Sequence, residues 1–286
     1  MTPLWFEGSL DMEESDRDYR FDWNRQSRTG IPEVVLAEYK SDAQLLEIAS
    51  VAIDKGKTLF FTRLSAVQAS ALSTAIEHGI HYHQESRTLY VGATPLQAAD
   101  PTRAIVQAQA GMTTLDTPEP LHVRPQSSGV SHDRVRHIQI AIVAAGTSDI
   151  PVVAEIEQTL LYLGFDSVRY VDVGVAGLWR LMELKDTLNQ HAVVIAVAGM
   201  EGALFSVLSG LVTAPVIAVP TSVGYGVGKG GHVALNAALC GCSPGLAVVN
   251  IDNGFGAAAL AVKMLRLQDK EPCVAPAQTS DQVPEM

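Results

Sequence analysis

The feature that most constrains the fold is the alternation, between residues 138 and 267, of five short apolar runs with longer helix-forming segments. Most of the runs are continuously apolar, which is typical of strands buried on both faces of a sheet. Strands separated by helices of this length imply right-handed crossovers and an α/β fold with a doubly wound, flavodoxin-like parallel sheet. The predicted strands are Ile138–Ala144, Val168–Val173, Ala192–Ala198, Pro215–Val219 and Leu246–Asn250, and the predicted helices are Pro151–Leu163, Val175–Leu188, Glu201–Leu211, Gly231–Leu239 and Gly256–Leu267.

A small α/β N-terminal domain is predicted ahead of this sheet. Strand-like runs occupy Glu33–Tyr39, Lys57–Arg63 and Thr88–Gly92. Ser41 and Ser65 each precede a helical segment and are followed three residues later by glutamine, the pattern of a capping box at a helix N-terminus. We therefore divide the chain into a polar N-terminal arm (1–30), a small α/β domain (31–95), a linker (96–136), the parallel-sheet domain (137–267) and a mobile tail (268–286).

Composition excludes several classes of function. The net charge of −11 argues against a nucleic-acid binder, because neutralising phosphates needs a basic face. The first thirty residues lack the apolar core of a signal peptide, and Pro215 and Pro220 interrupt the most apolar stretch, so neither secretion nor a membrane span is predicted. The three cysteines are too few and odd in number for a disulfide framework, which fits a cytoplasmic protein.

The turns after the strands carry the candidate binding residues, because ligands of open parallel sheets bind at the carboxyl ends of the strands. Small residues there leave helix N-terminal amides free to hold a phosphate, although the same glycines could serve only to make tight turns. Neither a dinucleotide fingerprint nor a P-loop is present. The candidate substrate-binding residues on these turns are Gly146, Thr147, Ser148, Asp149, Gly199, Met200, Ser222, Asn250, Asp252 and Asn253.

Two side chains are candidates for catalysis. Cys242 lies just before the last predicted strand and could be either a nucleophile or a small buried apolar residue. Glu201 stands in an otherwise uncharged run, where it could be a helix N-terminal carboxylate, a partly desolvated acid suited to proton transfer, or both. No metal site is predicted, because a Cys240/Cys242 pair and a cluster of His78, His81 and His83 are both weak alternatives.

Five ordered segments carry a resemblance to a known family. They are Gly146-Thr-Ser-Asp149, Asp172-Val-Gly-Val-Ala-Gly177, Val197-Ala-Gly-Met-Glu-Gly-Ala-Leu204, Pro220-Thr-Ser-Val-Gly-Tyr-Gly226 and Val248-Val-Asn-Ile-Asp-Asn-Gly-Phe-Gly256. At these residues the chain resembles the LarB family of pyridinium-3,5-biscarboxylic acid mononucleotide synthases, whose product begins the assembly of the nickel-pincer cofactor. Arg28-Thr-Gly-Ile-Pro-Glu-Val-Val35 and Lys40 extend the resemblance, which covers residues 16 to 267, into the N-terminal domain.

The resemblance implies a PurE-like catalytic domain that carboxylates nicotinic acid adenine dinucleotide with carbon dioxide or bicarbonate and releases AMP. It makes Cys242 the covalent nucleophile, Glu201 the acid–base residue and Ser148 a substrate-binding hydroxyl, while Arg180 is a candidate for stabilising phosphate charge. It also implies a homo-oligomer, expected to be an octamer with sites shared between subunits. No cofactor is firmly implied, although Mg²⁺ would suit the cleavage of the phosphoanhydride.

Three departures from the family pattern keep other functions open. Trp179 replaces an expected histidine, Phe205 replaces an expected proline, and Lys229 is an added cation in a glycine-rich loop. The alternatives are a PurE-type aminoimidazole ribonucleotide carboxylase and a non-catalytic nucleotide-binding regulator, for which Trp179 is the main indication.

Overall fold

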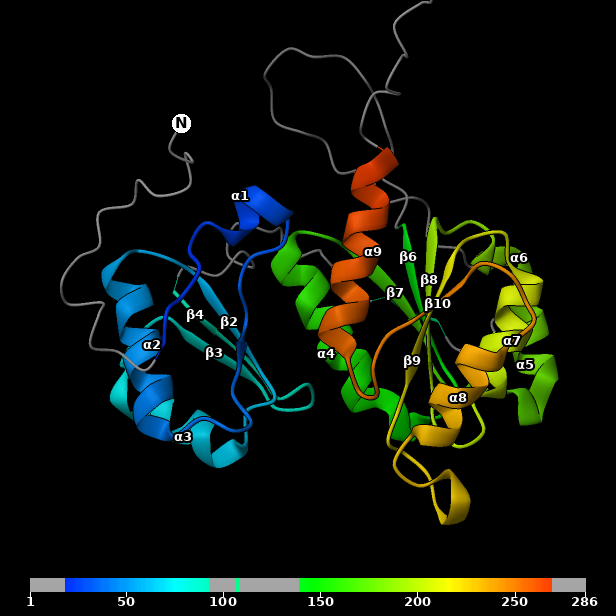
Figure 1. The fold of residues 1–286 in the computed structure, drawn as a ribbon, viewed down its shortest axis with the longest axis horizontal. Coiled ribbons are helices and arrows are strands. Elements are labelled where there is room, and N and C mark those ends of the chain that lie inside the picture. Colours follow the sequence, from blue (N-terminus) through cyan, green and yellow to red (C-terminus); the bar gives the residue numbers. More distant parts are fainter. Residues whose placement is uncertain (1–18, 93–105, 109–138, 269–286) are drawn as a thin grey trace, which may run out of the picture. The chain divides into compact units, whose positions relative to one another are not determined.

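The computed structural model describes residues 19–92, 106–108 and 139–268. The chain divides into two compact units, Met1–Thr94 and Pro95–Met286 (Figure 1). Each unit has its own sheet, in agreement with the predicted α/β architecture. The candidate binding residues all belong to the second unit, which we call the catalytic unit.

The first unit is a four-stranded mixed sheet with the strand order β1-β2-β4-β3. Strands β1 and β2 are parallel, whereas β4 is antiparallel to both β2 and β3. Both predicted capping boxes are present, since the Ser41 hydroxyl accepts from the Gln44 amide and the Ser65 hydroxyl accepts from the Gln68 amide. In chain order the elements are α1 (Arg25–Thr29), β1 (Val35–Leu36), α2 (Asp42–Asp54), β2 (Leu59–Thr62), α3 (Ala66–Ala75), β3 (Ile80–His83) and β4 (Thr88–Val91).

Strand β3 contains two of the histidines that we grouped as a weak metal-site candidate. It is an edge strand whose residues are at most partly buried, so it lacks the apolar signal of its neighbours. The His83 Nδ1 atom lies 2.8 Å from the Ser86 hydroxyl, which gives this side chain a partner within its own hairpin. Within the described ranges, no group of three or more His, Cys, Asp or Glu side chains is arranged to hold a metal ion.

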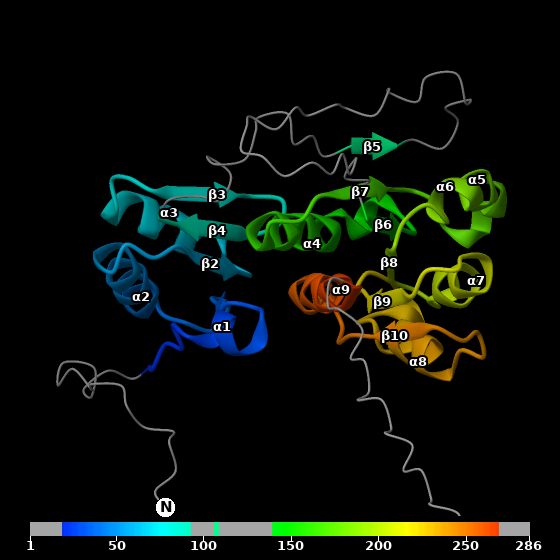
Figure 2. The ribbon, with the colours of Figure 1, turned by 90° about the horizontal axis from the view of Figure 1, so that it is seen from above.

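The catalytic unit is a six-stranded parallel sheet with the order β10-β9-β8-β6-β7-β5. Helices α4 and α9 pack together on one face of the sheet, and α5, α7 and α8 lie on the other (Figure 2). The strands are β5 (Val106–Ala108), β6 (Ile140–Ala144), β7 (Ser167–Tyr170), β8 (Val193–Ala198), β9 (Val216–Pro220) and β10 (Leu246–Val248). The helices are α4 (Ile150–Leu163), α5 (Leu178–Glu183), α6 (Lys185–Leu188), α7 (Ala203–Leu211), α8 (His232–Cys240) and α9 (Gly254–Gln268).

Burial explains why the strands of this unit were readable from the sequence. Every residue of β6, β8 and β9 is buried, because helices cover both faces of the sheet. By contrast, β10 is a three-residue edge strand that is only partly buried. The most continuously apolar of the predicted runs are therefore the strands β6, β8 and β9 at the centre of the sheet.

Two details differ from the sequence-based expectation. The single helix predicted over Val175–Leu188 is a 3₁₀ turn (η3, Val175–Gly177) followed by α5 and α6, which are separated at Leu184. The segment predicted as a linker contains β5, which pairs in parallel with β7 at the sheet edge, while the rest of the linker, most of the N-terminal arm and almost all of the tail lie outside the described residues. No helix among the described residues has the length and apolarity needed to cross a membrane.

Candidate functional site at the carboxyl edge of the sheet

The carboxyl edge of the parallel sheet gathers nearly all of the candidate binding residues. The strand order places the ends of β6, β8, β9 and β10 side by side, so four predicted turns lie at one edge. These turns carry Gly146–Asp149 after β6, Gly199–Glu201 after β8, Thr221–Ser222 after β9 and Asn250–Asn253 after β10. The residues predicted at the strand ends therefore lie at one edge of the sheet, although some of them are more than 100 positions apart in the chain.

Asp149 is the buried centre of this edge, with a side chain only 3% exposed. Its Oδ1 accepts a hydrogen bond from the Thr221 hydroxyl at 2.7 Å, and its Oδ2 accepts from the Gly146 amide at 3.0 Å. Burial raises the pKa of Asp149, the two hydrogen bonds oppose that shift, and the charge of Asp252 adds to it. Both carboxylate oxygens thus have partners inside the protein, and Asp149 joins the turn after β6 to the end of β9.

Asp252 makes a second connection between turns. Its Oδ1 accepts from the Ser222 amide at 2.8 Å, and its own amide donates to the Pro220 carbonyl at 2.8 Å. The residue has a φ of 55°, in the left-handed region that few non-glycine residues adopt. Asp252 therefore holds the turn after β10 against the end of β9.

Side-chain caps also fix the start of α9 beside Asp252. Buried Glu155, on α4, accepts from the Gly254 amide through its Oε2 at 3.1 Å. Asn253 accepts from the Gly256 amide at 2.8 Å, as an N-terminal capping residue does, and Asn250 accepts from the Ile251 amide at 2.9 Å. The sequence analysis did not identify Glu155, because one carboxylate on a helix gives no sign that it reaches an element about 100 residues away.

The turns after β8 and β9 approach each other without space for an additional carbon. The Met200 amide donates to the Val223 carbonyl at 3.1 Å. A Cβ on Gly199 would lie 2.8 Å from the Thr221 hydroxyl oxygen and would overlap the Val223 carbonyl. Met200 itself has a φ of 49°, so the backbone is strained next to Glu201.

Glu201, Thr147, Ser148 and Ser222 are four exposed polar residues of the edge, and a fifth, Asn250, uses its side-chain oxygen to accept from the Ile251 amide. Glu201 lies after the strained Met200 and directly before the Gly202 cap of α7. This supports the interpretation of Glu201 as a helix N-terminal carboxylate, and its exposure in the single chain leaves it able to reach a ligand. These four side chains can act on a bound molecule, whereas Asp149 and Asp252 organise the turns that carry them.

Arg180 lies beside the same edge, on the short helix that follows β7. Its Nη1 atom is 2.7 Å from Asp172 Oδ2, and the Arg180 side chain is 23% exposed. A Cβ on Gly177 would lie 2.7 Å from Arg180 Nε, so the absence of a side chain there leaves space for the guanidinium group. Arg180 is thus a positioned, partly exposed cation. The neighbouring Trp179, which stands in place of the expected histidine, is 61% exposed.

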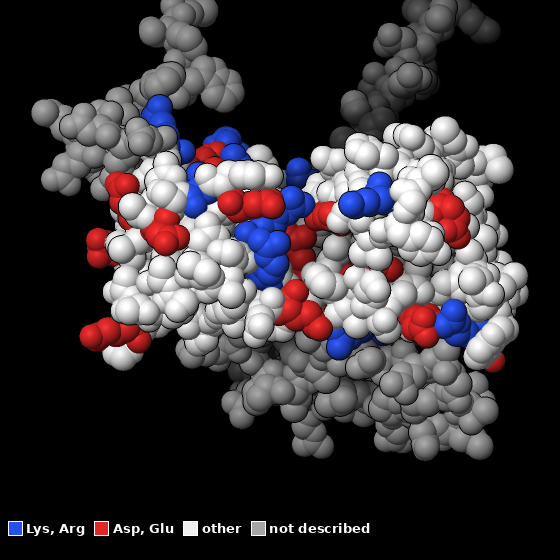
Figure 3. Space-filling model, turned by 90° about the horizontal axis from the view of Figure 1, so that it is seen from below, with Lys and Arg blue, Asp and Glu red and all other residues white. Residues whose placement is uncertain are grey.

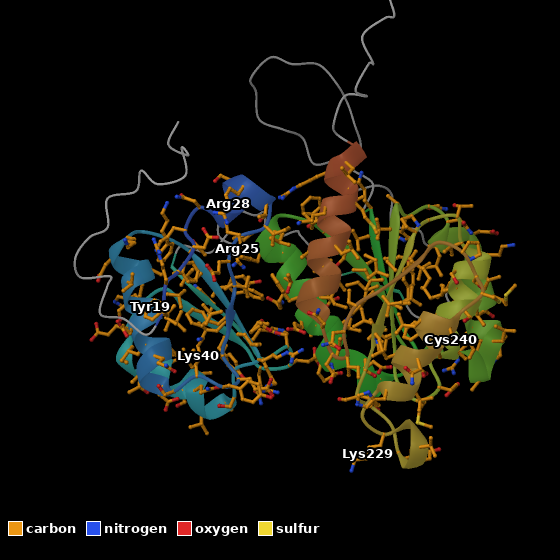
Figure 4. All side chains as sticks on the ribbon, in the orientation of Figure 1. Tyr19, Arg25, Arg28, Lys40, Lys229 and Cys240 are labelled. Atoms are coloured by element: carbon orange, nitrogen blue, oxygen red, sulfur yellow. The ribbon has the colours of Figure 1, made fainter. Side chains whose placement is uncertain are left out.

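Cys242 does not lie with the other predicted site residues. It precedes β10, so it is at the amino edge of the sheet, where the Val216 amide at the start of β9 donates to the Gly245 carbonyl. Both Cys242 and Cys240 are exposed free thiols. Figure 4 shows Cys240, at the end of α8, well separated from Lys229, which marks the carboxyl edge. Within one chain, Cys242 and Glu201 are separated by the length of a strand, on the order of 15 Å.

On one face of the molecule the charges are mixed in sign. On the face seen in Figure 3, acidic and basic side chains are interspersed with uncharged ones rather than gathered into one broad patch. The carboxylates of Asp149, Glu201 and Asp252 lie on turns at the same edge as the exposed hydroxyls. An anionic ligand there would therefore depend on backbone amides and a few placed cations.

Comparison with known proteins identifies the family. A model of the LarB/PurE-like N-terminal domain matches residues 14–93, and a model of the AIR carboxylase domain matches residues 139–280. An uncharacterized protein of Methanocaldococcus jannaschii is 31% identical over 266 residues, which cover 90% of this chain and 88% of that protein. The chain belongs to the LarB family. The resemblance seen in the sequence motifs is thereby confirmed, and this LarB-family protein is a PurE-related enzyme of the carboxylase class.

Two further similarities concern the catalytic unit of this LarB-family protein. The N5-carboxyaminoimidazole ribonucleotide mutase of Methanocaldococcus jannaschii is 32% identical over 138 residues, which cover 46% of this chain and 81% of that protein. A crystal structure of Treponema denticola PurE matches with a TM-score of 0.37 and 21% identity, covering 45% of this chain and 80% of that chain.

Proposed function

We propose that this LarB-family protein carboxylates the pyridinium ring of nicotinic acid adenine dinucleotide and cleaves its phosphoanhydride. The products are pyridinium-3,5-biscarboxylic acid mononucleotide and AMP. The observation that carries the proposal is that one LarB-family chain presents both an exposed thiol, Cys242, at the amino edge of the sheet and an exposed carboxylate, Glu201, beside hydroxyls at the carboxyl edge. A cytoplasmic location suits the two exposed free thiols.

The Cys242 thiolate supplies the electron pair that makes the ring reactive toward carbon dioxide. A pyridinium is electron-poor, so its C5 does not attack carbon dioxide. Addition of the Cys242 thiolate to an adjacent ring carbon converts the ring to a dihydropyridine whose C5 is nucleophilic, which is covalent catalysis. The new C5–carboxyl bond forms, Glu201 takes the C5 proton as general base, and the C–S electron pair returns to sulfur as the ring regains its aromaticity.

The hydroxyls and amides of the carboxyl edge suit the phosphates. Ser148 and Thr147 are exposed at the turn after β6, and Arg180 is held beside the turns by Asp172. Water adds to one phosphorus of the phosphoanhydride, and the P–O bond to the bridging oxygen breaks. AMP leaves with either the bridging oxygen or the oxygen of the water, and two protons are released.

The separation of Cys242 from Glu201 leads us to propose a site shared between subunits. If both residues act on one ring, the thiol of one copy must meet the carboxyl edge of another, because one chain holds them at opposite edges of its sheet. The side chain of Leu239, near the same end of α8, is 64% exposed, which provides apolar surface next to Cys242 for such a contact. We propose a homo-oligomer, with an octamer as the expected size.

Mixed subunits test the shared site directly. We would purify Cys242→Ser and Glu201→Gln homo-oligomers, confirm that each is inactive, dissociate and reassemble them together, and follow product by mass spectrometry with bicarbonate and the dinucleotide. A site built from two subunits restores about a quarter of the wild-type activity, because one random pairing in four has both native residues. No recovery in reassembled mixtures, with full recovery of reassembled wild type, would show that one subunit holds both residues.

A PurE-type carboxylation of aminoimidazole ribonucleotide is the second candidate. The similarity of the catalytic unit to the N5-carboxyaminoimidazole ribonucleotide mutase of Methanocaldococcus jannaschii favours it. That chemistry does not require a cysteine. Turnover of aminoimidazole ribonucleotide, undiminished in Cys242→Ser, would therefore support this candidate against the pyridinium carboxylase.

A further inference from the structure

The loop between β9 and α8 has a fixed base at the carboxyl edge. The Gly230 amide donates to the Ser222 carbonyl at 3.3 Å, which closes the loop on itself. A Cβ on Gly228 would lie 3.3 Å from Met200 Cα, so the loop backbone packs directly on the residue before Glu201. The base of the loop is therefore continuous with the candidate site.

Three side chains beyond Ser222 in this loop are exposed to solvent. Tyr225 is 78% exposed and Val227 is 90% exposed, and the Lys229 side chain is exposed as well. Figure 4 shows Lys229 at the end of the catalytic unit, on the loop that precedes α8. Lys229 has no ion pair among the described residues, whereas the other cation near this edge, Arg180, is paired with Asp172. An aromatic ring and an unpaired ammonium group thus stand on one short loop.

The Tyr225 ring and the Lys229 ammonium group suit the AMP half of the proposed substrate, which a mononucleotide lacks. A dinucleotide carries a second phosphate and a purine, while the edge itself contributes the carboxylates of Glu201, Asp149 and Asp252. A second phosphate close to these carboxylates needs a cation to offset their repulsion. An exposed aromatic side chain offers a face on which a base can stack.

We propose that the loop Ser222–Gly231 binds the AMP half of the dinucleotide, with Lys229 on its phosphate and Tyr225 against its purine. This inference rests on the proposed function and adds a specificity element to it. The loop makes the enzyme prefer a dinucleotide to a mononucleotide, since neither side chain is needed to hold the pyridinium half.

Binding measurements test the loop without requiring turnover. Titration calorimetry on the full chain would compare nicotinic acid adenine dinucleotide, AMP and nicotinic acid mononucleotide as ligands of the wild type, Lys229→Met and Lys229→Arg. We expect Lys229→Met to raise the Kd for the dinucleotide and for AMP by about tenfold or more, as loss of a charged hydrogen bond does, and to leave the mononucleotide unchanged. Lys229→Arg should retain most of the affinity. Tyr225→Ala should raise the Kd for AMP by a similar factor, as loss of a stacked base does, and Tyr225→Phe should leave it unchanged.

The matched control is Lys263→Met, an exposed lysine on α9 that lies ten residues, or about 15 Å of helix, beyond the turn that ends at Asn253. It should change none of the three affinities. Equal affinities in wild type and Lys229→Met overturn the inference while the proposed function stands. A Lys229→Met variant with a changed oligomer size and unchanged AMP binding would also overturn the inference, because the loop would then be a subunit contact. A wild type that binds neither the dinucleotide nor AMP overturns the proposed function and this inference with it.

Discussion

The two edges of the catalytic sheet differ in how they use their residues. At the carboxyl edge, buried Asp149 and Thr221 form a hydrogen-bonded network with Gly146, and Asp252 and Glu155 extend the network to the start of α9. At the amino edge, Cys240 and Cys242 are exposed beside exposed Leu239. One edge is organised within the chain, whereas the other offers reactive and apolar groups to the outside.

This difference shows what a single chain can and cannot assemble. The carboxyl edge can position hydroxyls, amides and a carboxylate around an anion by itself. Among the described residues it has no thiol of its own, since Cys240 ends α8 and Cys242 lies in the turn after that helix. The proposed chemistry therefore needs the amino edge of one subunit to complete the carboxyl edge of another.

The largest expected effect concerns the nucleophile at the amino edge. Cys242→Ser should lose the covalent adduct and at least about 10³-fold in turnover, because a serine hydroxyl is far less ionised at neutral pH than a thiol. Intact-protein mass spectrometry without carbon dioxide detects the adduct. Cys240→Ser is the matched control, since it removes an exposed thiol two residues away and should keep full activity. An inactive Cys240→Ser with an active Cys242→Ser would transfer the role to Cys240.

The next effect concerns the acid–base residue at the carboxyl edge. Glu201→Gln should reduce turnover about 10²-fold or more, as loss of a general base does, because the amide cannot take the C5 proton. Since Glu201 is exposed, folding and dinucleotide affinity should be preserved, which calorimetry and thermal unfolding would check. Wild-type turnover in this variant would remove Glu201 from the mechanism.

A pair of glycine substitutions compares the packing of the two edges. Gly199→Ala should destabilise the protein by about 1–3 kcal/mol and impair activity, because the added carbon meets Thr221 and the Val223 carbonyl. Gly210→Ala, near the other end of α7, should stabilise it by about 0.5–1 kcal/mol, since its Cβ has only the Ser243 hydroxyl within contact, at 3.8 Å. Chemical denaturation measures both changes. Equal tolerance at the two sites would contradict the tight approach of the turns at the carboxyl edge.

The smallest expected effect is a pH dependence from Asp149. Its pKa is raised in the folded protein, so the folded state holds this proton more tightly than the unfolded state. The contribution of Asp149 to the free energy of unfolding should be largest below the ordinary aspartate pKa and should decrease as pH rises to the raised value. Asp149→Asn should cost about 1–3 kcal/mol by disturbing the bonds to Thr221 and Gly146, and this cost should shrink over the same pH range.

Denaturation of both proteins between acidic and neutral pH measures that difference. Thr221→Val provides the control, because it removes one hydrogen bond to Asp149 but keeps the titrating carboxyl group. A cost of Asp149→Asn that grows with pH would mean that the carboxylate is stabilised rather than disfavoured by its site.

The sequence by itself was sufficient for five of the six strands of the parallel sheet, for the capping boxes and for the grouping of the strand-end turns. The runs at β6, β8 and β9 are apolar because both faces of those strands are covered, and a local pattern of that kind can be read without a structure. The short edge strands β3 and β5 were missed for the converse reason, since an edge strand needs less apolar sequence. The family motifs lie in the turns, so they too were visible in the sequence.

Only the tertiary structure separated the residues that organise the site from those that can act in it. Asp149 and Ser148 are neighbours in one motif, yet the first is buried with two internal partners and the second is exposed. Likewise, Cys242 and Glu201 lie only about 40 positions apart, yet they occupy opposite edges of the sheet. Whether a residue is buried, and at which edge of the sheet it lies, depends on contacts between segments distant in sequence. Examples are the contacts of Asp149 with Thr221 and of Glu155 with Gly254, and no local pattern of residues encodes them.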